Sequence, residues 1–239
     1  MVRLFSHSNI RIIKYFSTFS FNPGMRIIPV LLFFVISIGG SSQEIFHPDL
    51  SGFSQETIVK AKSNDMVMFM TDEEKEVVFY SNLVRLKPHI FLETIVKPYV
   101  KINYPYRNYY VKSLVADLKR AQPVGQLVMK KDLYIMSRNH QADIGKNSIH
   151  GHTGSKGKTF NKRAKHLMLK YYGVSENIGL GFISPIENVL ELLIDDGVVD
   201  LGHRVTILSE KYNCVGVSIG THKTYGTGCV IDYGFLLND

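Results

Sequence analysis

The sequence contains few cysteines: Cys214 and Cys229 are the only two among 239 residues. A fold held by several disulfides is therefore excluded, and the folded chain must be stabilised by its hydrophobic core. Hydrophobic residues make up 45% of the chain, which is enough for one domain with a proper core. Neither cysteine lies in a context typical of a reactive thiol, and no serine lies in a nucleophile elbow.

The first 42 residues contain no acidic residue. They hold Arg3, Arg11, Lys14 and Arg26, and subtracting these four charges from the net charge of +7 leaves +3 for the rest of the chain. The basic pI is therefore largely a property of this leader. It is not evidence for the basic folded surface that nucleic-acid binding requires, and no nucleic-acid partner is predicted.

An apolar run of 12 residues, 27–38, follows Met25-Arg26 and precedes Gly39-Gly40-Ser41-Ser42. This order of basic, apolar and small residues is typical of a secretory signal. A spanning helix needs about 20 residues, so a membrane anchor is the less favoured alternative, and no cysteine follows the run to carry a lipid. We expect a signal peptide at 25–42, an upstream extension or longer basic region at 1–24, and a secreted or periplasmic mature protein without a stable transmembrane anchor.

The sequence contains two clear signals for the start of a helix. Thr71 with Glu74 forms a capping box, and Ser184 precedes a proline at the first helical position with Glu187 at the third. Residues 133–144 also have a helical pattern, in which the polar residues at 137–140 indicate a solvated face. Gly197 is predicted to end the helix that begins after Ser184, and the polar residues 43–66 are predicted to be a linker.

Two strands are predicted at 206–220 and 227–234, joined by a turn within 221–225. If the turn is the pair Thr221-His222, Cys214 lies directly opposite Cys229 and a disulfide is within reach. A longer turn around Tyr225 shifts the register and can place the two thiols on different faces of the sheet. Both alternatives are open from the sequence.

Two glycine-preceded histidines, His152 and His203, are separated by acidic residues at Glu176 and at Asp195-Asp196. Imidazole nitrogens and carboxylate oxygens are the groups from which zinc sites and general-base sites are built. Helical spacing places Asp196 at the edge of the apolar stripe and Asp195 opposite to it. Asp196 is therefore predicted to face the site, and His203 is predicted in a short loop before the strand at 206.

The order and spacing of several short segments resemble the CAP superfamily of cysteine-rich secretory proteins, antigen 5 and plant pathogenesis-related proteins. The likeness is greatest to bacterial secreted members and covers about residues 67–236, the predicted domain. It implies an α+β fold, a three-layer α-β-α sandwich with a small, mainly antiparallel sheet between helices. The segments are Gly151-His152, Glu176-Asn177-Ile178, Gly202-His203-Arg204, Val215-Gly216-Val217 and Val230-Ile231-Asp232-Tyr233.

The resemblance also implies a solvent-open cleft formed by His152, Glu176, Asp196 and His203, which in some relatives binds zinc. His150 lies two residues before His152 and is a candidate third ligand. The alternative is that these histidines bind nothing and only form hydrogen bonds with the loop backbone. A cleft formed by these side chains, with zinc as a candidate cofactor, is therefore the prediction.

The resemblance implies an exported, non-enzymatic module that binds a ligand or partner at the cell envelope, a lipid or envelope polymer among the candidates. The alternative is a zinc-dependent hydrolase of peptide or cell-wall material, with Glu176 or Asp196 as base for a metal-bound water. A run of basic residues between 156 and 170 contains no acid. It is either a contact for an anionic surface or a solvated helix face.

Overall fold

The computed structural model describes residues 45–236 with the exception of residue 107. The predicted signal peptide at 25–42 and the extension at 1–24 lie outside the described residues. No helix within the described part of the chain is both long enough and apolar enough to cross a membrane.

A four-stranded sheet forms the middle layer, in the order β1-β3-β4-β2. Its long strands are antiparallel, and only the short β1 pairs in parallel with β3. β2 is an edge strand, so one side of it faces away from the rest of the sheet. The strands are β1 Val128–Met129, β2 Gly173–Leu180, β3 Cys214–His222 and β4 Gly226–Phe235.

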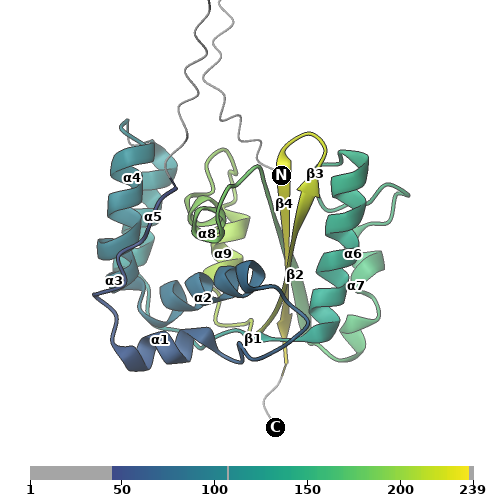
Figure 1. Cartoon of the computed structure of the whole chain (residues 1–239), viewed down its shortest axis with the longest axis horizontal. Coiled ribbons are helices and arrows are strands. Elements are labelled where there is room, and N and C mark those ends of the chain that lie inside the picture. Colours follow the sequence, from purple (N-terminus) through teal and green to yellow (C-terminus); the bar gives the residue numbers. More distant parts are fainter. Residues whose placement is uncertain (1–44, 107, 237–239) are drawn as a thin grey trace, which may run out of the picture. The chain divides into compact units, whose positions relative to one another are not determined.

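Helices cover both faces of the sheet, which confirms the predicted three-layer α-β-α fold (Figure 1). One face is covered by α6 Lys131–Asn147, with the short α7 Phe160–Ala164 and the 3₁₀ turn η2 Leu167–Leu169 beside it. α2 Asp72–Leu86, α8 Pro185–Ile194 and α9 Gly202–Leu208 lie on the other face. The remaining helical segments lie outside this second layer: α1 Gln55–Lys62, α3 Pro88–Phe91, η1 Leu92–Val96, α4 Lys97–Asn103 and α5 Tyr109–Arg120.

The two predicted helix caps are confirmed. Thr71 Oγ1 accepts from the backbone N–H of Glu74, and the Glu74 carboxylate accepts from the backbone N–H of Thr71. Ser184 Oγ accepts from the backbone N–H of Glu187 at the start of α8. Each cap satisfies N–H groups that have no partner within the helix, so these helices begin where the local sequence places them.

Three local predictions are wrong. Residues 202–208 form helix α9 rather than a loop and the start of a strand, because Ile207 is buried in the core there and tertiary packing overrides the weak strand preference of β-branched residues. The segment at 43–66 is not only a linker, since it contains α1, whose Ala61 is fully buried against the core. α8 ends at Ile194, before Gly197, with Asp195 in the left-handed conformation.

The β3–β4 hairpin has the longer of the two predicted turns. His222 pairs with Gly226, so a three-residue loop joins the strands, and Gly226 adopts a positive φ of 76°. In this register Cys214 faces Gly234 and Cys229 faces Ile219. The two thiols are free and buried on opposite faces of the sheet, so a disulfide between them is excluded by this geometry.

Helix α6 lies so close to β3 that Gly216 has no room for a side chain. A Cβ atom on Gly216 would lie 2.0 Å from the backbone nitrogen of Tyr134. We expect Gly216→Ala to lower the free energy of unfolding by at least about 2 kcal/mol, because backbone atoms must separate to admit the methyl group. Gly125→Ala is the matched control, since nothing lies within 4 Å of a Cβ built there. Urea denaturation measures both, and equal midpoints for the two variants would contradict the close packing.

Candidate functional site

The candidate site is organised by two adjacent residues of the edge strand β2, Glu176 and Asn177. Successive side chains of a strand point to opposite faces of the sheet. Glu176 points toward α6, where its carboxylate meets side chains from the loops and helices of that layer. Asn177 points toward α9, where its amide donates to the backbone carbonyl of His203 over 3.1 Å. The two predicted histidines are therefore attached to opposite faces of the same strand.

A buried carboxylate lies at the centre of the first group. The Glu176 side chain is 1% exposed, and its Oε1 accepts from His152 Nδ1 and from Arg163 Nη2, each at 2.8 Å. Burial raises the pKa of Glu176, but the hydrogen bonds from His152 and Arg163 outweigh it and hold the pKa below its ordinary value. Glu176 is thus an ionised carboxylate neutralised by a guanidinium.

A second carboxyl group, Asp232, lies beneath Glu176 on the neighbouring strand β4. The two residues are register partners, and Asp232 is fully buried. Burial and the charge of Glu176 raise the pKa of Asp232 well above its ordinary value, although Ser137 Oγ donates to it over 2.8 Å. Asp232 therefore keeps its proton to a higher pH than an ordinary aspartate does, and in the protonated form its O–H can donate to Glu176, the partner with which it interacts.

His140 of α6 completes this group, which we call the Glu176 cluster: Ser137, His140, His152, Arg163, Glu176 and Asp232. His140 is 1% exposed, and its Nε2–H donates to the carbonyl of Gly151 over 3.0 Å. Burial lowers the pKa of His140, despite the nearby charge of Glu176. The neutral ring therefore places an unprotonated Nδ1 inside the cluster.

Buried polar atoms without a hydrogen-bond partner concentrate in the Glu176 cluster. Within the described residues seven such side-chain atoms occur, and five belong to this cluster: His140 Nδ1, Arg163 Nε and Nη1, Glu176 Oε2 and Asp232 Oδ1. A proton on Asp232 pairs the two carboxyl oxygens, which leaves one acceptor on His140 and two donors on Arg163. Burying a polar group without a partner costs stability. Such groups are therefore retained mainly where they serve a function, and they concentrate at functional sites.

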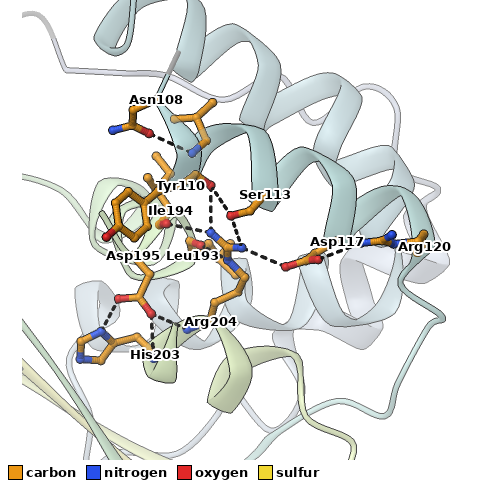
Figure 2. Close-up of polar contacts among 11 residues, drawn as sticks. Asn108, Tyr110, Ser113, Asp117, Arg120, Leu193, Ile194, Asp195, His203 and Arg204 are labelled. Atoms are coloured by element: carbon orange, nitrogen blue, oxygen red, sulfur yellow. Dashed lines mark hydrogen bonds and ion pairs between the residues drawn. The ribbon is translucent and has the colours of Figure 1, made fainter. Parts of the chain in front are cut away.

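The second predicted histidine forms a separate pair on the other face of β2. His203 Nδ1 lies 2.6 Å from Asp195 Oδ1, and Asp195 Oδ2 accepts from the backbone N–H groups of His203 and Arg204 (Figure 2). Asp195 is 2% exposed. The prediction that Asp196 would be the acid nearer to the histidine is wrong. The helical wheel fails because α8 ends at Ile194 and Asp195 turns into the left-handed conformation, which redirects its side chain.

Arg204 fixes this second pair to the end of α8. Its guanidinium is buried and donates to the carbonyls of Leu193 and Ile194, the last residues of the helix (Figure 2). It also reaches α5 through Asp117, at 2.9 Å. A cation at a helix C-terminus interacts favourably with the helix dipole, so Arg204 offsets the cost of placing Asp195 there. Its contacts are all structural.

The hydrogen bonds thus place the predicted site residues in two His–carboxylate pairs. His152 and Glu176 form one His–carboxylate pair, and His203 forms another with Asp195. Convergence of His152, Glu176, Asp196 and His203 on one cleft stays a prediction. His150 does not accompany His152: its Nε2 lies 3.0 Å from the hydroxyl of Tyr225 on the β3–β4 hairpin, and its side chain is exposed.

The donor set of the Glu176 cluster does not fit a zinc ion. The oxygen of Glu176 that faces His152 already accepts a hydrogen bond from the guanidinium of Arg163, whose charge repels a divalent cation. Among the described residues, no group of three or more histidine, cysteine, aspartate or glutamate side chains is placed to hold a metal. The second pair, His203 with Asp195, offers only two such groups.

Sequence reasoning missed His140, Arg163 and Asp232. The polar segment of α6 was predicted to be solvated, yet Ser137 and His140 are buried and only its middle residues are exposed. Arg163 was counted only as part of a basic stretch. Asp232 carried the one usable signal, because a single acid within the apolar strand at 230–233 must be protonated or paired when the strand is buried.

Comparison with known proteins identifies one family. A model described as "CAP: Cysteine-rich secretory protein family" matches residues 105–233, which is more than half of the chain. No curated protein matches the chain significantly.

Several solved structures are similar to this chain at low identity, with TM-scores below 0.5. An outer surface protein from Borrelia burgdorferi is 14% identical with a TM-score of 0.41, over 54% of this chain and 90% of that one. An extracellular protein containing an SCP domain from Bacillus anthracis is 14% identical with a TM-score of 0.38, and the match covers 53% of this chain but 38% of that one. The CAP domain of enterococcal PrgA is 18% identical with a TM-score of 0.36, over 78% of this chain and 73% of that domain.

The opposite pKa shifts of Glu176 and Asp232 predict opposite effects of removing their charge. Glu176→Gln leaves the buried guanidinium of Arg163 without its counter-ion, so we expect a loss of about 3 kcal/mol in unfolding free energy at neutral pH. Asp232→Asn copies the protonated carboxyl, because its amide can donate to Glu176 and its oxygen can accept from Ser137. Below the ordinary carboxyl pKa of 3.8, where Asp232 is protonated in the unfolded chain as well, we expect the unfolding free energy of this variant to differ from that of wild type by less than about 1 kcal/mol.

The same pair predicts a pH dependence. The folded protein keeps the proton of Asp232 above the unfolded-state pKa of 3.8, so this residue makes wild type lose stability as pH rises from there toward the raised folded-state pKa. Asp232→Asn should therefore gain stability relative to wild type as the pH rises from about 4 toward neutrality. Urea denaturation across this range measures the difference, and a constant difference would show that Asp232 is ionised in the folded state.

Proposed function

This chain belongs to the cysteine-rich secretory protein (CAP) family, and we propose that it is an exported, non-enzymatic module that binds a ligand or partner at the cell envelope. The Glu176 cluster is the proposed recognition site. The observation that most supports this site is the concentration of unpartnered buried polar atoms beneath His152, whose side chain is 38% exposed. A half-exposed imidazole held by a fixed carboxylate is a preorganised group for contacting a polar ligand.

The state of each charge in the cluster favours binding over hydrolysis. A general base must take a proton, yet the pKa of Glu176 is lowered and its carboxylate is engaged by Arg163. The raised pKa of Asp232 favours its protonated form, and this residue is fully buried. The zinc-dependent hydrolase that the sequence also suggests would need metal ligands that this donor set does not favour. Binding is accordingly the function proposed for this chain.

Export is part of the proposal and rests on the leader. The basic, apolar and small-residue order of residues 25–42 is typical of a secretory signal. A mature protein beginning after this segment carries two buried free thiols and no disulfide between them. N-terminal sequencing of the exported protein tests this part directly, and we expect a start between Gly40 and Gln43.

Co-sedimentation with isolated cell envelopes of the source organism tests the binding function. We expect wild-type protein to sediment with the envelopes and His152→Ala to bind about tenfold more weakly, because a hydrogen-bonding group above the cluster is lost. His89→Ala is the matched control, since His89 is exposed on α3. Soluble peptide and sugar released from the envelopes are measured in the same samples, and we expect no release above that of envelopes alone.

Two results would overturn this proposal. Wild type that stays in the supernatant, or His152→Ala that sediments as well as wild type, removes the Glu176 cluster as the recognition site. Release of soluble fragments by wild type but not by His152→Ala would instead identify an enzyme. Repeating that release with added zinc and with a chelator then decides whether the activity depends on a metal.

A further inference from the structure

A basic and apolar surface lies on the α6 layer, on the segment that follows the loop of His152. We call it the α7–η2 surface, and its members are Lys158, Lys162, Lys165, Met168 and Leu169. All five are exposed: the lysines lie just before, within and just after α7, and Met168 and Leu169 lie in the 3₁₀ turn η2. Figure 1 shows α7 beside α6, on the side of the sheet opposite α2 and α8.

The apolar members of this surface protrude while their neighbours anchor the segment. Leu169 is 91% exposed and Met168 is 50% exposed. Leu167, the residue before Met168, is 2% exposed, and Ala164 at the end of α7 is fully buried, so both residues anchor the segment to the domain. The anchored turn thus leaves about half of the surface of Met168 and most of that of Leu169 unburied within this chain. Their position favours contact with an apolar medium outside it.

A groove of about 540 Å³ separates this segment from α6. Its lining combines basic side chains with apolar ones: Ile135, Met136, Asn139, Lys158, Lys162, Arg163, Lys165, His166 and Leu169. In the described part of the chain no acidic residue lines it. The lysines are therefore uncompensated within the groove, which suits an anionic group such as a phosphate.

The nearby acidic residues are engaged elsewhere. Asp132 pairs with Lys170 at 2.7 Å, and Asp143 accepts from the backbone and the hydroxyl of Ser155. Arg163, which lines the groove, pairs with the buried Glu176. The net positive charge of the α7–η2 surface is therefore carried by Lys158, Lys162 and Lys165.

We propose that the α7–η2 surface docks on an anionic phospholipid bilayer. The lysines contact headgroup phosphates at the groove, and Met168 and Leu169 enter the boundary between headgroups and acyl chains. Basic residues are attracted to the surface potential of anionic lipids, and exposed apolar side chains add area removed from water. The biological setting of this docking rests on the proposed envelope function. The five residues of the α7–η2 surface do not include His152 or Glu176, so the two proposals can be tested separately.

Vesicle sedimentation with the mature protein tests the docking surface. The probes are vesicles of equal parts phosphatidylcholine and phosphatidylglycerol, and vesicles of phosphatidylcholine alone. We expect binding to the anionic vesicles that weakens at high salt, and little binding to the neutral ones. The double variant Lys162→Gln, Lys165→Gln should bind at least about tenfold more weakly, and Leu169→Ser about fivefold more weakly.

Matched controls come from α4 on the other side of the domain. Lys101 is exposed there and Ile102 is 68% exposed, so Lys101→Gln and Ile102→Ser remove the same kinds of group. Both should bind anionic vesicles as wild type does. All substituted residues are exposed, and equal thermal midpoints confirm that every variant is folded.

The outcomes separate this proposal from the proposed function. Absence of wild-type binding to anionic vesicles, or equal weakening by the α4 controls, overturns the docking surface and leaves the His152 test untouched. His152→Ala should bind vesicles like wild type. If it loses vesicle binding while the α7–η2 variants keep it, the lipid belongs to the Glu176 cluster and the docking proposal is wrong.

Discussion

The buried carboxylate of Glu176 is the interaction on which the α6 side of this domain depends. An ionised group that is 1% exposed must be neutralised and hydrogen-bonded. Arg163 supplies the counter-ion, and its donation to the carbonyl of His152 also ties α7 to the loop before it. The cost of a second buried acid is avoided by keeping Asp232 protonated. The charge states of the whole cluster therefore follow from the burial of one carboxylate, that of Glu176.

Buried guanidinium groups perform a comparable structural task on the opposite side of the sheet. Arg85 is 1% exposed and donates to four backbone carbonyls, which belong to two segments far apart in sequence. Arg204 joins the end of α8 to α5 through carbonyls and the carboxylate of Asp117. These groups satisfy loop and helix-end carbonyls that otherwise lack partners. The pair formed by Asp195 and His203 is held within this framework.

A histidine paired with a carboxylate thus occurs on both sides of the sheet, but the two pairs differ in their surroundings. His203 and Asp195 are both nearly buried, and the Asp195 carboxylate is occupied by backbone N–H groups, which makes the pair a structural clasp at the end of α8. His152 is partly exposed and lies over a cluster with unpartnered atoms. The proposed recognition site is therefore placed on the α6 side of β2, next to the basic and apolar surface of α7 and η2.

The sequence by itself determined the features that depend on near neighbours: the caps at Thr71 and Ser184, the helix around 133–144, the two late strands and the short motifs of the family. It also identified His152 and Glu176, because each lies within a short recognisable motif. Only the tertiary structure decided which acid meets His203, that the two cysteines do not face each other, and that Asp232, His140 and Arg163 join Glu176. These outcomes depend on where α8 ends, on the register of the β3–β4 hairpin, and on the alternation of side chains between the two faces of β2. The contacts concerned join residues far apart in the chain, whose pairing local spacing does not encode.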